Sequence, residues 1–141
     1  MKFEIAQKWV EALRSGQYTQ AKKTLKTVEG SMCCLGVLCN LYDPKGWSSD
    51  VETFTALTEE GNPEKLIGFN SFVDSNGEKE SSFLPKEVSD WAGMISHTGY
   101  VGNVSTDDVP AGHIDLPELN DTVGWDFKAI ASFVEKYWEQ M

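Results

Sequence analysis

The uncharged apolar run at residues 32–42 constrains the fold more than any other stretch of this chain. Its length is set locally, because Glu29-Gly30 precede it and Asp43-Pro44 follow it. Its leucines recur at the spacing of one helix face, although an apolar run this short is also compatible with a strand. The length of the run and the proline at its end favour a helix. We therefore predict a helix over residues 32–42 that is buried on most sides and packs against the other elements.

The chain is predicted to form one domain, residues 1–141, because this length is enough for a single hydrophobic core. A hydrophobic fraction of 40% and five tryptophans indicate that such a core exists. No apolar segment approaches the roughly 20 residues that cross a bilayer, and the first residues do not read as a signal peptide. We expect a cytoplasmic protein that does not bind a membrane.

Amphipathic helices are predicted near both ends of the chain. In residues 3–15 apolar side chains recur at three- and four-residue steps, and Gly16 follows, as glycine often does just past a helix. Asp126 is placed to cap a helix over residues 127–138, which has a continuous apolar face. Two briefer helices are predicted at residues 84–94 and 116–121.

The other segments indicate a small antiparallel sheet. Asn76-Gly77 is the strongest hairpin signal in the chain, within a polar region at residues 47–83 that contains isolated apolar side chains. Further strands are predicted at residues 24–28 and 100–104. The expected fold class is α+β: a small antiparallel sheet, a buried central helix, and amphipathic N- and C-terminal helices.

The charge of the chain is unevenly distributed. The net charge is −10, yet residues 1–28 carry six basic and two acidic side chains, a local charge of +4, which leaves −14 for the rest. The acidic part would repel duplex nucleic acid, so we expect no such partner. A small anion that reaches the basic segment is compatible with this distribution. The acidity is also compatible with a role in solubility alone.

The cysteines and histidines do not form a recognisable metal or thiol site. Cys33, Cys34 and Cys39 lie inside the apolar run at spacings unlike those of zinc sites, and His97 and His113 are remote. Apolar surroundings raise the pKa of a thiol and make it unreactive. We expect reduced, metal-free cysteines and no cofactor. Motifs for phosphate-binding loops, nucleophilic serines and zinc proteases are absent, so no catalytic residue is assigned.

A basic segment just before the apolar run is the strongest candidate for a binding site. It combines an aromatic ring, an amide and three cations at Tyr18, Gln20, Lys22, Lys23 and Lys26. Such a set is suited to stacking on a base and neutralising a phosphate. The alternative interpretation is a solvated lysine face.

Three more residues are candidates for lining a ligand pocket. Trp47 lies in a polar loop next to Gly46, where a role in the core is less expected. Asn120 and Asp121 are polar residues in an otherwise apolar segment. The alternative for this pair is a turn and a helix cap.

Four stretches of the sequence resemble a family of small bacteriophage-encoded proteins. The stretches are K-W-V-E-A-L-R-S-G-Q-Y-T-Q, C-C-L-G-V-L-C-N-L-Y, L-P-K-E-V-S-D-W-A-G, and L-N-D with F-K-A-I-A; residues 45–82 lie outside them. The function of that family is uncharacterised, so the resemblance assigns no catalytic residue. Asn40 departs from the acidic residue expected after the third cysteine, and Lys22-Lys23 replaces a connection richer in glycine or threonine.

The resemblance implies a protein that acts during infection of a bacterial host. Without an enzyme motif, the expected function is sequestration of a small nucleotide-derived anion that activates host defence. Two alternatives stay open. The acidic part is suited to binding a host protein, including by imitating nucleic acid. A small nucleotide hydrolase would use carboxylates together with His97 or His113. The sequence does not determine the oligomeric state.

Overall fold

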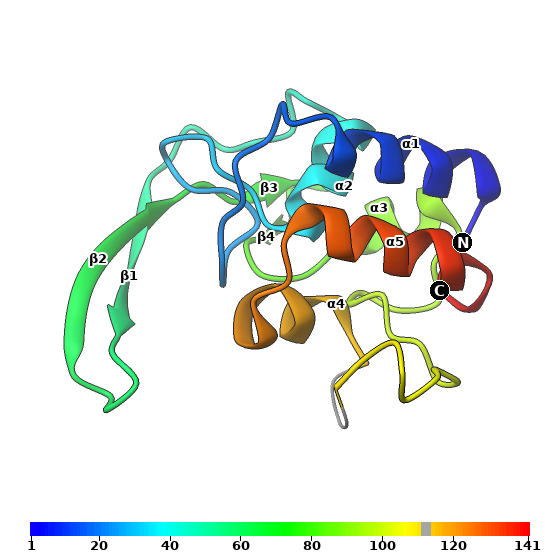
Figure 1. Ribbon diagram of the computed structural model, residues 1–141. Coiled ribbons are helices and arrows are strands. Elements are labelled where there is room, and N and C mark those ends of the chain that lie inside the picture. The colour runs from blue at the N-terminus through cyan, green and yellow to red at the C-terminus, as the bar shows by residue number, and fades with distance from the viewer. Residues whose placement is uncertain (111–113) are drawn as a thin grey trace.

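A computed structural model of the protein describes residues 1–110 and 114–141, so the predicted loop position of His113 lies outside the described residues. Helices form one side of the molecule, and a β-hairpin projects from it as a curved arm (Figure 1). The helices are α1 (Phe3–Arg14), α2 (Cys34–Tyr42), α3 (Lys86–Ala92), α4 (Leu116–Glu118), a π-helix (Leu119–Val123), α5 (Phe127–Tyr137) and a 3-10 turn (Trp138–Gln140). The strands are β1 (Glu52–Leu57), β2 (Pro63–Phe69), β3 (Phe72–Val73) and β4 (Lys79–Glu80). This arrangement confirms the predicted α+β fold.

Helix α2 lies at the centre of the core, as the apolar run predicts. Its side chains from Cys34 to Cys39 are buried, and Leu38 is 0% exposed. The helix begins at Cys34 because Cys33 caps it: the Gly36 N–H donates to Cys33 Sγ over 3.4 Å. Its main neighbours are α1, α3 and α4. Helix α5, at the C-terminal end of the chain, packs mainly on α1 instead.

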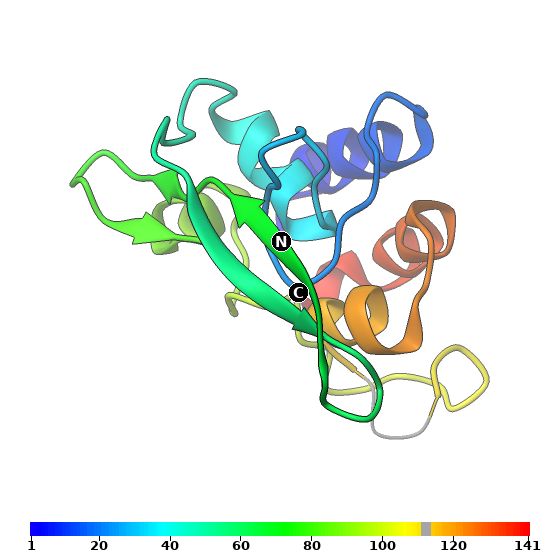
Figure 2. The same cartoon turned by 90° about the vertical axis from the view of Figure 1, so that its left-hand side faces the viewer.

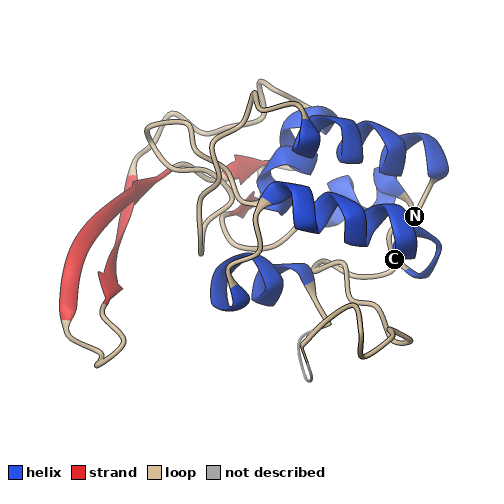
Figure 3. Ribbon diagram, viewed as in Figure 1, coloured by secondary structure: helices blue, strands red, loops and turns tan. Residues whose placement is uncertain are grey.

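Helices α1 and α5 lie side by side in opposite directions (Figure 3). Their apolar faces are buried, as the three- and four-residue periodicity predicts. Two side-chain contacts join the helices: Arg14 donates to Glu135 over 2.9 Å, and the rings of Phe3 and Trp138 are 5.4 Å apart. Asp126 caps α5 as expected, because its Oδ1 accepts the Ala129 N–H at 2.8 Å.

Replacing Leu38 with alanine is expected to lower the free energy of unfolding by about 2–5 kcal/mol, because a buried leucine leaves a cavity when it is truncated. Denaturant titration followed by circular dichroism measures the change. Leu66→Ala is the matched control: Leu66 is 66% exposed, so its loss should change stability by less than about 0.5 kcal/mol. Equal effects of the two substitutions would contradict the central position of α2.

The strands form two separate two-stranded sheets. The signal at Asn76-Gly77 is confirmed: β3 and β4 pair on either side of this turn, where Gly77 has φ +81°. The longer hairpin, β1–β2, lies in the polar region for which a small antiparallel sheet was predicted. Its register places Phe54 opposite Ile67 and Thr55 opposite Leu66.

Two predicted strands are wrong. Residues 24–28 contain only isolated bridges, at Lys26 and Thr27, because the segment turns back on itself: the Thr27 N–H donates to the Ser31 carbonyl at 2.8 Å. Residues 100–104 are irregular, because this segment lies beside no strand among the described residues. It is anchored through the Val101 N–H, which donates to the Ile114 carbonyl at 3.1 Å.

Candidate functional site

Asn120 is fully buried at the centre of a network of amides. Its Oδ1 accepts from Gln20 Nε2 at 2.8 Å and from the Cys34 N–H at 3.4 Å. Its Nδ2 donates to the Ala21 carbonyl at 2.9 Å and to Asp121 Oδ1 at 2.7 Å. The Gln20 amide also donates to a backbone carbonyl at residue 125, over 2.8 Å. The structure therefore brings Gln20, Asn120 and Asp121 together, as a link between the basic segment and the π-helix.

This network favours the structural interpretation of Asn120, although not as a turn and cap. Both Nδ2 protons of Asn120 and both Nε2 protons of Gln20 have protein partners, so these donors are not free for a ligand. Buried amides whose groups are all paired fix the relative positions of the segments they join. Through Gln20 and Ala21 the network holds the segment that carries Lys22 and Lys23.

Three other candidates meet around Asn40. The Trp47 Nε1–H donates to Asn40 Oδ1 at 3.0 Å, and Asn40 Nδ2 donates to the Tyr18 hydroxyl at 3.2 Å. Lys26 Nζ lies 5.3 Å from the centroid of the Trp47 ring, within reach of a cation–π interaction. Asn40 was not among the predicted site residues. The signal that singled it out was the resemblance, in which an acidic residue is expected at this position.

Lys22 and Lys23 line a different feature, a cleft of about 350 Å³ between the basic segment and the β1–β2 hairpin. Lys65 of β2 lines the same cleft, so its lining contains three lysines and one carboxylate residue, Glu29. Lys23 has φ +66°, a left-handed conformation that non-glycine residues adopt at a cost. The lining residues are Gln20, Ala21, Lys22, Lys23, Thr27, Glu29, Ser31, Phe54, Ala56, Lys65, Leu66, Ile67 and Gly68.

The predicted site residues of the basic segment, together with Trp47, lie in two separate places in the structure: the cleft and the group around Asn40. Gln20, Lys22 and Lys23 line the cleft, whereas Tyr18, Lys26 and Trp47 form the neighbouring aromatic group. Sequence analysis missed Lys65 and Phe54, which the hairpin brings to the cleft. No local pattern marks them, because β1 and β2 lie far along the chain from the basic segment.

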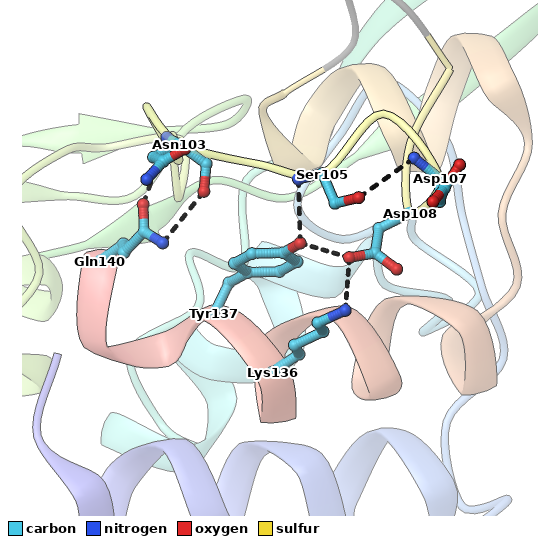
Figure 4. Close-up of polar contacts among 7 residues, drawn as sticks. All are labelled: Asn103, Ser105, Asp107, Asp108, Lys136, Tyr137 and Gln140. Atoms are coloured by element: carbon cyan, nitrogen blue, oxygen red, sulfur yellow. Dashed lines mark hydrogen bonds and ion pairs between the residues drawn. The ribbon is translucent and has the colours of Figure 1, made fainter.

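A second polar group holds the 103–108 loop against the end of α5 (Figure 4). Asp108 accepts from Lys136 Nζ at 2.6 Å and from the Tyr137 hydroxyl, which in turn accepts the Ser105 N–H at 3.1 Å. Gln140 Nε2 donates to the Asn103 carbonyl at 3.0 Å, and Gln140 Oε1 accepts the Asn103 N–H at 3.2 Å. Hydrogen bonds from Lys136 and Tyr137 lower the pKa of Asp108, so it stays ionised. The group is paired internally and fastens the loop.

The three cysteines are free thiols and buried, as predicted. Burial raises the pKa of Cys33 to about 12 and raises those of Cys34 and Cys39 as well. The described residues, 1–110 and 114–141, contain no group of three or more metal-ligating side chains. None of the described helices has the length and apolarity that crossing a membrane requires.

In the native protein, a maleimide or other thiol reagent at neutral pH is expected to label Cys33, Cys34 and Cys39 only after unfolding. The reason is that a thiol must ionise to react, and burial suppresses the thiolate. Mass spectrometry with and without denaturant measures the labelling, and native spectra after incubation with zinc serve as the metal test. Rapid labelling of the folded protein, or stoichiometric zinc, would contradict the prediction.

The fold and these side chains define a small α+β protein with a lysine-lined cleft beside a β-hairpin arm. The model of a family described as a domain of unknown function, DUF8296, matches residues 1–138, and the chain belongs to this family. No curated protein sequence and no solved structure matches the chain.

Proposed function

We propose that this protein binds a small nucleotide-derived anion in the cleft between the basic segment and the β1–β2 hairpin, and releases it unchanged. The observation that carries the proposal is that three lysines, Lys22, Lys23 and Lys65, are among the residues that line one cleft in a chain of net charge −10. The surrounding acidity disfavours long polyanions. A compact phosphate compound avoids that repulsion and gains charge-assisted hydrogen bonds.

The rest of the lining suits the other parts of a nucleotide. Phe54 and Ile67 are cross-strand partners on the same face of the hairpin, and they provide an apolar surface for a base. Glu29 offers an acceptor for an amino or hydroxyl group. Clefts of this kind, with an apolar wall and a few polar groups, are typical of small-molecule sites.

The kinds of side chain in the cleft support binding without turnover. Its ionisable residues are lysines and one glutamate, and none of the lining residues is a histidine, cysteine or aspartate. His97, a candidate acid or base for a hydrolase, instead has its Nδ1 3.1 Å from the Leu84 carbonyl. In the cytoplasm of an infected bacterium, the context that the phage resemblance implies, such a protein would act against host defence by sequestering a nucleotide signal.

The Lys22→Ala/Lys23→Ala double variant is expected to bind the nucleotide at least tenfold more weakly. Each charge-assisted contact contributes about 1.5–3 kcal/mol, and about 1.4 kcal/mol corresponds to a tenfold change in Kd. Calorimetry with a panel of cyclic and ADP-ribose-type nucleotides measures the affinity. The control is Lys8→Ala/Lys128→Ala, which removes the same charge from exposed positions outside the cleft.

Recovery of the ligand after heating the complex separates binding from catalysis. Intact nucleotide supports sequestration, and altered nucleotide would favour the hydrolase. Unchanged affinity in the Lys22/Lys23 variant would place the site elsewhere. If the parent protein binds no nucleotide at micromolar concentration, the proposal fails.

A further inference from the structure

Strand β1 is an edge strand of the projecting hairpin, because it pairs with β2 on one side only. On the other side, β2 is bonded near its end to the basic segment: the Val28 N–H donates to the Gly68 carbonyl at 3.0 Å, and the Asn70 N–H donates to the Lys26 carbonyl at 3.1 Å. Among the described residues β1 pairs with β2 alone. The arm extends away from the helices in Figure 1 and lies in front of them in Figure 2. Since β1 has one strand partner, alternate N–H and C=O groups along its other side have no strand to pair with among the described residues.

The outer face of the arm is apolar and exposed. Val51 is 62% and Leu66 is 66% exposed. Gly68 lies between Val28 and Val51, whose methyl groups come within 3.2 and 3.5 Å of the position that a Cβ would occupy. An isolated two-stranded ribbon is only marginally stable, and it gains most from a further strand or an apolar cover.

The charge of the arm selects the kind of strand that can be added. The segment at residues 50–64 contains no basic residue and five acidic ones: Asp50, Glu52, Glu59, Glu60 and Glu64. Edge-to-edge pairing with a second copy would bring two such segments together, and like charges on adjacent strands are destabilising. A basic strand avoids this repulsion and gains from opposite charges.

We propose that the free edge of β1 binds an extended, positively charged segment of another protein as an added strand. Main-chain hydrogen bonds to residues 52–57 supply the pairing, and the carboxylates at and near the tip select lysine- or arginine-rich segments. Aliphatic side chains of the added strand cover the outer face at Val51 and Leu66. Phe54, Ala56 and Leu66 of the same hairpin also line the lysine-lined cleft, but strand addition uses the main chain at the edge of β1 and does not depend on nucleotide binding.

The test uses the full-length protein and a capped peptide of alternating lysine and valine, seven residues long. Two peptide controls are included: the same sequence with N-methylated valines, which keeps the charge but removes main-chain donors, and a version with glutamate for lysine. Amide chemical shifts and hydrogen exchange report where each peptide binds. On the protein side, Glu59→Gln/Glu60→Gln/Glu64→Gln is compared with Glu4→Gln/Glu11→Gln/Glu139→Gln, a matched change at exposed positions elsewhere.

The expected result is protection of amide protons confined to residues 52–57, with affinity at least tenfold lower for the N-methylated peptide. The tip variant should also bind at least tenfold more weakly than the control variant. Equal binding of the N-methylated peptide would reduce the effect to unspecific charge attraction and overturn the proposal. So would shifts at another surface, absence of binding at millimolar peptide, or sedimentation showing that the protein associates with itself through β1.

Discussion

Alanine at position 36 is expected to prevent the chain from reaching its native fold. A Cβ on Gly36 would lie 1.9 Å from the Leu25 carbonyl oxygen and 2.8 Å from the Leu25 carbonyl carbon. Overpacking against side chains costs about 1–3 kcal/mol, because side chains can turn aside. The atoms in contact here belong to the backbone, so the expected loss is larger, on the order of 5 kcal/mol, which approaches the total stability of many domains.

The backbone at Leu25 cannot easily move away. Its N–H donates to the Ser81 carbonyl at 2.7 Å, its carbonyl accepts the Cys33 N–H at 3.3 Å, and its side chain is 0% exposed. A shift of the Leu25 backbone large enough to admit the methyl group would break its hydrogen bonds to Ser81 and to Cys33. Circular dichroism and thermal unfolding of the purified variant measure the effect.

Gly102→Ala is the matched control for this substitution. A Cβ at Gly102 meets only the Tyr100 ring at 3.6 Å, an ordinary van der Waals distance, so the change in stability should stay within about 0.5 kcal/mol. A Gly36→Ala protein that unfolds at the parent temperature would show that α2 does not lie against the Leu25 backbone.

Removing the Asn120 amide is the second substitution with a large expected effect. Asn120→Ala leaves the Ala21 carbonyl and the Cys34 N–H without their partner in the core, and it frees one proton of the Gln20 amide. A buried polar group that loses its partner costs about 1–3 kcal/mol. We expect the free energy of unfolding to fall by about 2–4 kcal/mol, as measured by denaturant titration.

Asn62→Ala serves as the control, because Asn62 is exposed near the tip of the hairpin. Its substitution should change stability by less than about 0.5 kcal/mol. If Asn120→Ala lowers the free energy of unfolding as little as Asn62→Ala does, the buried network does not hold the basic segment to the π-helix. In that case Asn120 would again be available for a role in binding.

The candidate site shows where sequence reasoning reached its limit. The sequence placed Tyr18 and Lys26 in one basic segment and Trp47 in a separate loop, and the structure brings the three residues together. Asn40 bonds both Tyr18 and Trp47. The sequence singled it out only because the resemblance predicts an acidic residue at this position. Asn120 was predicted to line a ligand pocket, with a turn and cap as the alternative. It is instead buried in a π-helix, where its amide bonds residues about a hundred positions earlier in the chain.

The sequence by itself determined the helices, including the central one. Helical periodicity, the Asp126 cap and the glycine after α1 all act between residues a few positions apart, so a short window of sequence contains the whole signal. Apart from the β3–β4 hairpin, which Asn76-Gly77 marks in the sequence, only the tertiary structure decided which segments became strands and which lysines line one cleft. Residues 24–28 pair with other segments only through isolated bridges. Residues 52–57 and 63–69 pair with each other along their length as β1 and β2. The cleft joins Lys22 to Lys65 by packing between distant segments, and no local pattern encodes such a contact.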